Sequence, residues 1–321
     1  MRRGPRLAAP MDYPPRVRIY EVGPRDGLQN EAKPIPTDAK LAYIALLRTA
    51  GLREIEATSF VSPHAIPQLA DADDLFPALT DVSGPDGVRY PVLVPNVRGM
   101  SRAEAAGATA LAVFTAASDE FTKRNIGMTI DESLEAFQPV LDRATSLGWW
   151  KRAYVSTAFG CPFTGTVAVK SVVDVSIRLA EMGADEICLG DTIGVGVPSQ
   201  VHALTQAVTA AGLPLEQLAY HFHDTRGTAL ANVVAGLEDG VTCFDSSTGG
   251  TGGCPYAPGA AGNLATEDLV YLLDGLGIEH GVDLNGVLEA ARFIADALGK
   301  PLASKVGQAG GWDPATGQRR T

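Results

Sequence analysis

The amino-acid sequence predicts a single (β/α)₈ TIM barrel followed by one additional C-terminal helix. From about residue 17, short apolar and β-branched runs alternate with longer segments of helical periodicity, and eight such units can be counted. Several helical segments end in A-G-L or M-G-A directly before the next strand, as expected for a glycine helix stop. No Pro/Ser-rich linker or change in composition divides the chain. One domain therefore accounts for the pattern better than the alternative, an open doubly wound sheet with an added domain.

The expected elements follow one another at βα spacing. The strands are residues 17–23, 53–60, 90–96, 110–117, 152–159, 186–192, 219–225 and 243–250. Helical segments between them include 38–50, 130–147, 170–183, 199–211 and 227–239, and residues 283–300 form the additional helix. We therefore expect a flexible extension over 1–16, the barrel over 17–300 and a polar, Gly-rich tail over 301–321 that is either a flap or disordered.

Composition excludes several classes of protein. With 45% hydrophobic and 20% charged residues the chain is typical of a globular protein, and its net charge of −11 argues against binding nucleic acid. No apolar run approaches the ~20 residues that span a bilayer. The N-terminus is basic without the apolar core of a signal peptide, and its prolines argue against the alternative, a short organellar presequence. Scattered cysteines without a C-x-x-C pair predict a reducing compartment, by default the cytoplasm: Cys161, Cys188, Cys243 and Cys254.

The segment H-F-H-D is the sharpest sign of chemistry. Residues two apart in a strand face the same side, so His221 and His223 point one way and Phe222 the other. Two imidazoles on one face of a barrel strand make half of a transition-metal or magnesium-type site. The alternative is a pair of core histidines satisfied by hydrogen bonds.

A second polar cluster, E-V-G-P-R-D-G-L-Q-N-E, follows the first strand. Arg25 and Asp26 lie together on a turn that Pro24 and Gly27 help to define. The carboxylate is a hard ligand for a divalent cation, and the guanidinium can bind a carbonyl or carboxylate of a substrate. A solvated salt bridge is the alternative.

A Gly-rich loop over residues 249–263 follows the eighth strand and contains Cys254 and Asn263. Such a loop can approach a ligand closely or move as a lid, and its thiol can exchange protons. An inert thiol in a flexible connection is the alternative. Glu56 and Asp191 end two further strands. All these residues therefore converge on the C-terminal mouth of the barrel, where barrel enzymes have their active sites.

These motifs resemble those of the 3-hydroxy-3-methylglutaryl-CoA lyases, part of a metal-dependent barrel group that includes isopropylmalate and homocitrate synthases. The resemblance runs from about residue 17 to 307 and includes E-V-G-P-R-D-G-L-Q-N-E, A-T-S-F-V-S-P, A-A-S-D-E-F-T-K-R-N, L-G-D-T-I-G-V-G, H-F-H-D-T and G-G-C-P-Y-A-P-G-A-A-G-N. The condensing synthases usually lack the G-G-C-P-Y-A loop, so the resemblance favours cleavage of a carbon–carbon bond over condensation.

The resemblance implies a role for each matching residue. It implies that Arg25 contacts the thioester carbonyl, that Cys254 is the catalytic thiol, that Asp26 or His221 is the base and that Glu56 supports the site. The implied metal ligands are Asp26, His221, His223 and Asn263, and these oxygen and imidazole donors suit Mg²⁺ or Mn²⁺. The implied substrate-binding residues are Arg25, Gln29, Ser59, Tyr154, Asp191 and Thr192.

The expected partner is an acyl-CoA substrate, and we expect a homo-oligomer. Lys123 and Arg124 are candidates for the CoA phosphates, with a solvated surface pair as the alternative. Two positions depart from the family pattern, because Arg226 stands where the best-known members have Tyr and Cys188 where many have Ser. If Arg226 faces the mouth, the acyl preference changes. Alternatives are therefore a lyase for another 3-hydroxy-3-alkylglutaryl-CoA, a related aldolase or condensing enzyme, or a barrel that binds CoA thioesters without catalysis.

Overall fold

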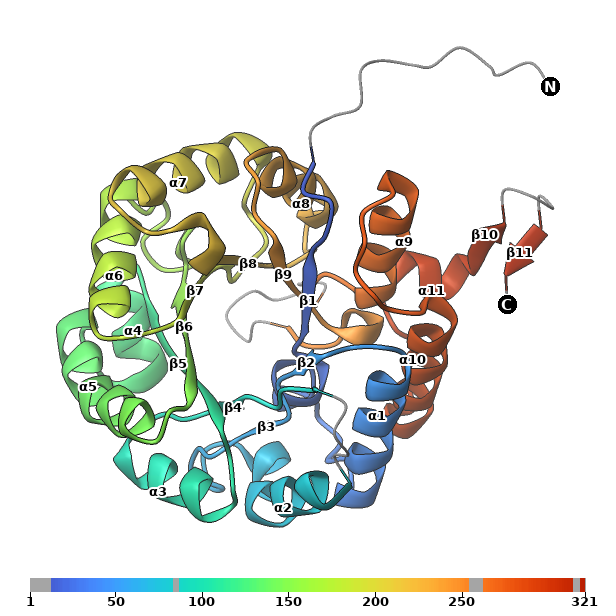
Figure 1. Ribbon diagram of the computed structural model, residues 1–321, viewed down its shortest axis with the longest axis horizontal. Helices are drawn as coiled ribbons and strands as arrows, with labels where there is room; N and C mark the ends of the chain where they lie inside the picture. Colours follow the sequence, from blue (N-terminus) through green and yellow to red (C-terminus); the bar gives the residue numbers. More distant parts are fainter. Residues whose placement is uncertain (1–12, 83–86, 254–261, 314–317, 321) are drawn as a thin grey trace.

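The chain folds into a closed parallel barrel surrounded by helices (Figure 1). The computed structural model describes residues 13–82, 87–253, 262–313 and 318–320. The main sheet has the order β2-β1-β9-β8-β7-β6-β5-β4-β3. Its two outer members, β2 (Glu54–Ile55) and β3 (Thr58–Ser59), are halves of one strand interrupted at residues 56–57. The sheet therefore closes on itself as eight strands, and the predicted TIM barrel is confirmed.

Each predicted strand segment overlaps an observed strand. The remaining strands of the barrel are β1 (Arg18–Glu21), β4 (Val92–Leu93), β5 (Ala110–Ala116), β6 (Trp150–Ser156), β7 (Glu186–Asp191), β8 (Leu218–Phe222) and β9 (Cys243–Ser246).

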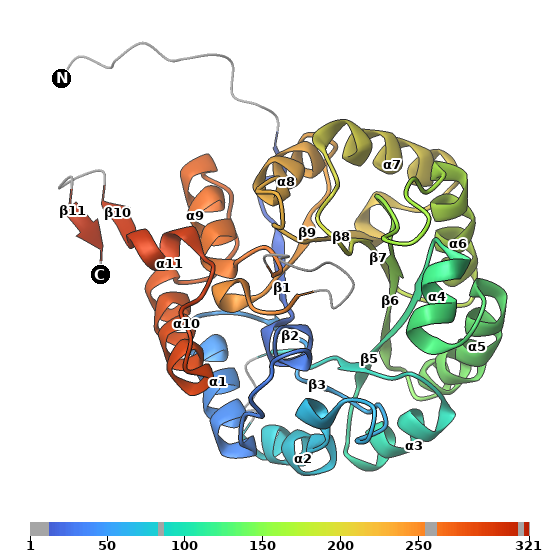
Figure 2. The ribbon, with the colours of Figure 1, turned by 180° about the vertical axis from the view of Figure 1, so that it is seen from behind.

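The helices form the outer layer in both axial views (Figures 1 and 2). They are α1 (Thr37–Thr49), α2 (Ala72–Val82), α3 (Val97–Ala105), α4 (Asp119–Ile126), α5 (Ile130–Ser146), α6 (Val169–Glu181), α7 (Pro198–Ala210), α8 (Ala229–Glu238) and α9 (Thr266–Leu276). The expected additional helix is α10 (Leu284–Leu298), which packs against α1. Its N-terminus is capped by Asp283, which accepts hydrogen bonds from two backbone N–H groups, and its C-terminus by Gly299 at φ +73°.

Alternation along the strands separates two layers of buried side chains. In β8, Tyr220 and Phe222 point outward into the layer between sheet and helices, with ring centroids 5.2 Å apart. Ala219 belongs instead to the cluster inside the barrel. Because residues two apart share a face, His221 lies on the interior side with Ala219. The apolar outer layer therefore holds the barrel together, while the interior is free to carry polar groups.

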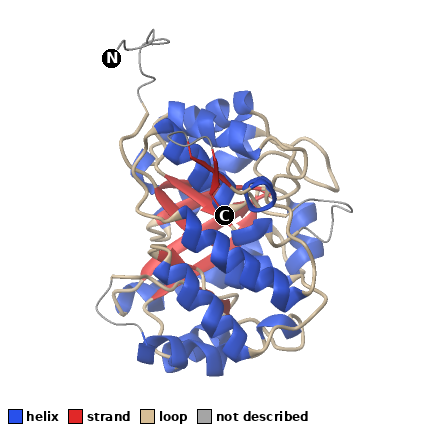
Figure 3. Ribbon diagram, turned by 90° about the vertical axis from the view of Figure 1, so that its right-hand side faces the viewer, coloured by secondary structure: helices blue, strands red, loops and turns tan. Residues whose placement is uncertain are grey.

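The tail contains regular structure in its described part. It forms α11 (Lys305–Ala309), β10 (Gly311–Asp313) and β11 (Gln318–Arg320), of which the two strands pair antiparallel. Asp268 of α9 accepts hydrogen bonds from Ser304 Oγ and from the N–H groups of Lys305 and Val306, at 2.7–3.1 Å. This tertiary cap fixes α11 against α9. Figure 3 shows the side of the molecule on which the C-terminus lies. Within the described ranges, no helix has both the length and the apolarity needed to cross a membrane.

Candidate active site

A cavity of about 580 Å³ opens at the C-terminal ends of the strands. It is lined by residues from segments far apart in the chain. Those predicted from the sequence are Arg25, Asp26, Gln29, Tyr154, Thr192, His221 and His223. The convergence expected at the barrel mouth is therefore present.

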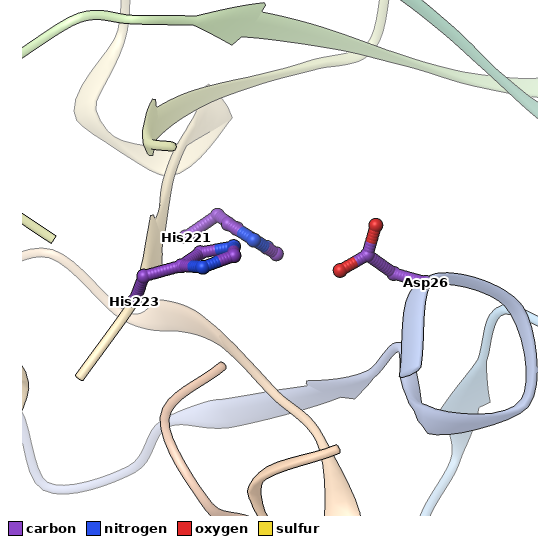
Figure 4. A group of neighbouring side chains, drawn as sticks. All are labelled: Asp26, His221 and His223. Carbon is purple, nitrogen blue, oxygen red and sulfur yellow. The ribbon is translucent and has the colours of Figure 1, made fainter. Parts of the chain in front are cut away.

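Three side chains in this cavity are placed to share one cation. Asp26 lies on the helical turn η1 (Gly23–Gly27) after β1, His221 in β8 and His223 just beyond it. One ligand atom from each lies within 4.8 Å of the other two. Figure 4 shows the carboxylate facing the two imidazoles across a gap. Their ring centroids are 5.2 Å apart, since both project from the same side of the extended chain.

Asn263 completes a set of four candidate metal ligands. Its Nδ2 donates hydrogen bonds to Asp26 Oδ2 at 2.7 Å and to the Thr251 carbonyl at 2.9 Å. These bonds orient the amide so that Oδ1 is the atom left over. Among the described residues, neither Asn263 Oδ1 nor His223 Nδ1 has a hydrogen-bond partner, although both are buried. Buried polar atoms normally have a hydrogen-bond partner, so these two unpaired atoms point to a missing ligand. A divalent cation fits, because carboxylate, imidazole and amide groups are all suitable metal ligands.

The environment sets protonation states that suit a metal site. Burial would raise the pKa of Asp26, but the charge of Arg25 and the two histidines outweigh it and lower that pKa to about 2. Burial, with the neighbouring His221, lowers the pKa of His223 to about 4. Burial also opposes the charged form of His221, yet its hydrogen bond to Asp245 raises the pKa. At neutral pH, Asp26 is therefore an anion and His223 a neutral imidazole.

Arg25 is held in place beside these candidate metal ligands. Its guanidinium donates to Asp26 Oδ1 at 2.8 Å and to Glu56 Oε2 at 3.1 Å. The Tyr154 hydroxyl donates to the same oxygen of Glu56 at 2.6 Å. Glu56 is fully buried and Arg25 is 7% exposed, so the pair is shielded from bulk water. Glu56 therefore orients the arginine.

Two predicted substrate-binding residues lie behind the cavity wall instead of lining it. Ser59 is buried and donates its hydroxyl to the Leu93 carbonyl at 3.1 Å. Asp191 accepts hydrogen bonds from the N–H groups of Val195 and Gly196, at 2.9 and 2.8 Å. The polar atoms of Ser59 and Asp191 are therefore engaged by backbone groups, and neither residue is among those that line the cavity. Thr192, the neighbour of Asp191, lines the cavity.

The residues suggested for CoA phosphates lie near the mouth but outside the cavity lining. Lys123 and Arg124 are exposed on α4, whose Phe121, Asn125 and Ile126 do line the cavity. Arg124 pairs with Glu120 at 2.6 Å. Cys254 lies outside the described residues.

The two departures from the family pattern are both placed by the structure. Arg226 does not line the cavity; its guanidinium donates to the carbonyls of Ile193 and Gly194, at 3.0 and 2.8 Å. It therefore braces the loop after β7. Cys188 is fully buried in the barrel interior, with its sulfur 3.6 Å from Asp245 Oδ2.

Sequence patterns did not reveal Asp245 or Arg152, both buried inside the barrel. Asp245 is in register with His221 on the neighbouring parallel strand, so strand order combined with residue parity would have found it. Asn96 and Asn125 also line the cavity, although no sequence pattern marked them.

A (β/α)₈ barrel with a carboxylate–imidazole–amide cluster at its C-terminal mouth has the architecture of metal-dependent barrel enzymes. The HMGL-like family model matches residues 16–294, and the chain belongs to this family. The predicted resemblance is thus confirmed.

Three relatives extend the comparison. "Hydroxymethylglutaryl-CoA lyase, mitochondrial" of Bos taurus is 51% identical over 92% of this chain and 90% of its own length. The crystal structure of hydroxymethylglutaryl-CoA lyase from Pseudomonas aeruginosa is 46% identical, with a TM-score of 0.90 over 93% of this chain and 98% of that one. An HMG-CoA lyase from Acinetobacter baumannii in complex with coenzyme A and 3-methylmalate is 38% identical, with a TM-score of 0.87 over 92% and 95%.

Proposed function

We propose that this chain is a hydroxymethylglutaryl-CoA lyase, a carbon–carbon lyase that cleaves 3-hydroxy-3-methylglutaryl-CoA to acetyl-CoA and acetoacetate. The observation that carries the proposal is the placement of Arg25 against Asp26, so that an oxyanion-binding guanidinium adjoins the metal-ligand group in one cavity. The names of the Bos taurus and Pseudomonas aeruginosa relatives support it.

The proposed metal is Mg²⁺ or Mn²⁺, held by Asp26, His221, His223 and Asn263. These ligands offer oxygen and imidazole nitrogen without a thiolate, which favours the harder cations. A divalent cation in this position lowers the pKa of a coordinated hydroxyl group and fixes the geometry of the substrate.

The chain's own residues supply the proton transfers and the charge stabilisation. Breaking the C2–C3 bond requires that the C3 hydroxyl lose its proton. Asp26 is the proposed acceptor, because its carboxylate keeps lone pairs beside the metal, whereas Nδ1 of His221 bonds to Asp245 and its other nitrogen is a proposed ligand. As the bond breaks, negative charge develops on the thioester oxygen. Arg25, oriented by Glu56, donates hydrogen bonds to that oxygen, an effect worth about 3–4 kcal/mol in comparable sites.

Cys254 is the proposed donor of the proton that C2 receives, a contribution of about 10²–10⁴-fold. Gln29, Tyr154 and Thr192 line the cavity and are proposed to contact the acyl chain. Coenzyme A in the Acinetobacter baumannii relative supports an acyl-CoA partner, with Lys123 and Arg124 as candidates for its phosphates.

The proposal extends to the organisation of the protein. Residues 17–300 form the catalytic domain, residues 1–16 an extension and residues 301–321 a tail. We assign the protein to the cytoplasm because its scattered cysteines suit a reducing compartment. We also propose a homo-oligomer, which light scattering after size-exclusion chromatography tests directly.

A second candidate is a lyase for another 3-hydroxy-3-alkylglutaryl-CoA. Part of the cavity wall is apolar, formed by Leu93, Phe114, Met128 and Phe137, and such a wall suits an alkyl group longer than methyl. Comparing kcat/KM for the methyl, ethyl and propyl thioesters separates the two candidates, because the better substrate identifies the function.

The deciding experiment is a coupled assay for acetoacetate released from 3-hydroxy-3-methylglutaryl-CoA with Mg²⁺. We expect turnover by the unchanged protein, and Cys254→Ala should reduce it by about 10²–10⁴-fold with metal binding intact. Cys161→Ala is the control, because Cys161 does not line the cavity. Unchanged turnover in Cys254→Ala would remove the thiol from the mechanism, and no acetoacetate from the unchanged protein would reject the proposed function.

A further inference from the structure

A buried carboxylate that no sequence motif marks holds one of the two site histidines. Asp245 of β9 is 1% exposed, and its Oδ2 lies 3.0 Å from Nδ1 of His221. The two residues are partners in the parallel pairing of β8 and β9, so the contact follows directly from strand register. The His221 ring is thereby fixed at one nitrogen, and its other nitrogen is directed away from Asp245.

The second oxygen of Asp245 is fixed as well. Oδ1 accepts a hydrogen bond from Arg152 Nη2 at 2.5 Å. Arg152 is fully buried, and its guanidinium lies 3.7 Å from the ring centroid of Tyr20 and 4.9 Å from that of Tyr154. As the ion-pair partner of a guanidinium, the carboxylate can only accept hydrogen bonds. The atom of His221 facing Asp245 must therefore carry a proton.

We infer that Asp245 is a positioning residue that keeps His221 protonated at Nδ1, so that the Nε2 lone pair faces Asp26 and His223. The inference concerns the metal site on which the proposed function rests. A metal-binding histidine commonly donates its second ring N–H to a carboxylate, which fixes the tautomer and the orientation of the ring. For His221 this service is performed by Asp245, which is its hydrogen-bond partner at Nδ1.

A purely structural role for Asp245, as counterion of Arg152, makes a different prediction. Glu186 also contacts Arg152, with Oε1 3.3 Å from Nε, and is 2% exposed. Glu186 therefore resembles Asp245 in burial and shares Arg152 as a partner, but it forms no hydrogen bond or ion pair with His221. Comparing the two carboxylates separates support of Arg152 from positioning of His221.

The test measures Mn²⁺ binding to metal-free protein by electron paramagnetic resonance, with thermal unfolding as a check on the fold. In Asp245→Asn the amide can present N–H to His221 and so favour the opposite tautomer, with Nε2–H toward the metal group. We expect Mn²⁺ affinity to fall by about 10–100-fold. Glu186→Gln should bind Mn²⁺ as the unchanged protein does. Equal losses in both variants, or no loss in Asp245→Asn, would overturn the inference.

A second measurement needs no substitution. Long-range ¹H–¹⁵N correlation spectra of the unchanged, Mg²⁺-loaded protein at pH 8 report which ring nitrogen of His221 carries the proton. We expect Nδ1, and a proton on Nε2 would overturn the inference even if Asp245→Asn does not fold. Neither measurement involves a thioester, so absence of acetoacetate formation would reject the proposed function and leave this inference standing.

Discussion

The hydroxyl of Tyr154 offers a sharp test of how the arginine of the site is held. It donates a 2.6 Å hydrogen bond to Oε2 of Glu56, which also binds Arg25. Burial, with the charge of Glu56, holds the pKa of Tyr154 well above its usual value, so the hydroxyl stays a donor. Tyr154→Phe removes that hydroxyl and keeps the ring.

The size of the stability loss follows from the contacts that Glu56 keeps after the substitution. Its other oxygen, Oε1, is buried with no hydrogen-bond partner among the described residues, so the substitution leaves only the 3.1 Å contact with Arg25. A hydrogen bond to a charged group contributes about 1.5–3 kcal/mol. We expect Tyr154→Phe to lower the free energy of unfolding by that amount, seen as a lower urea midpoint with unchanged slope. Turnover should fall too, because Arg25 loses its rigid support.

Tyr20→Phe is a matched control for this change. The Tyr20 ring is also buried against Arg152, but its hydroxyl has no hydrogen-bond partner within the described part of the chain. Removing an unpaired buried hydroxyl is close to neutral or stabilising. Equal urea midpoints for the two variants, or a loss below about 0.5 kcal/mol in Tyr154→Phe, would show that the Glu56 contact contributes nothing and would refute the reasoning.

Three further predictions address the metal, a buried acid and a tight turn. His223→Ala should reduce Mn²⁺ affinity by more than the roughly 10–100-fold expected when a residue that only hydrogen-bonds to a ligand is changed. Full Mn²⁺ affinity in calorimetry would contradict the assignment of His223 as a ligand, and His202→Ala on α7 is the control. Burial raises the pKa of Glu267 from 4.5 to about 7. The folded protein therefore holds this proton more tightly than the unfolded chain, and stability should decline by about 3 kcal/mol as pH rises from 4.5 through 7. Glu267→Gln should remove that part of the decline in urea midpoints measured across this range, and an identical pH profile would exclude the shift. A Cβ at Gly27 would clash with the hydroxyls of Thr251 and Ser247, so Gly27→Ala should cost about 1–3 kcal/mol and weaken metal binding; retained stability in urea would show that the turn can yield.

The barrel could be predicted because its signal is repeated. Each strand is short, has clear ends and is followed by a helical segment. Misplacing the ends of one strand therefore leaves the number of β/α units unchanged. The helices α3 and α4 are only nine and eight residues long and were not predicted, because hydrophobic periodicity needs a longer window. Nor could α11 be predicted from its own residues, because its cap comes from Asp268, more than thirty positions away.

The candidate site was predictable where chemistry and strand position coincide. Asp26, His221 and His223 meet as expected, because each follows or ends a strand at the same end of the barrel. Ser59 and Asp191 also lie at strand ends, but backbone groups take their polar atoms. Sequence locates a residue on the fold; whether its side chain reaches the cavity or bonds to a neighbouring loop depends on local packing that no motif encodes.

The least predictable part of the site is the interior that supports it. Two buried carboxylates each connect a site residue to the aromatic and cationic layer inside the barrel: Glu56 joins Arg25 to Tyr154, and Asp245 joins His221 to Arg152. These two hydrogen-bond networks meet at Tyr154, whose ring centroid lies 4.9 Å from the Arg152 guanidinium and 6.2 Å from the His221 ring centroid. Their links span 24 to 98 positions in the sequence, so closure of the barrel creates them. The orientation of both the guanidinium and the imidazole is therefore a property of the whole fold, and substitutions deep in the barrel should alter the chemistry at its mouth.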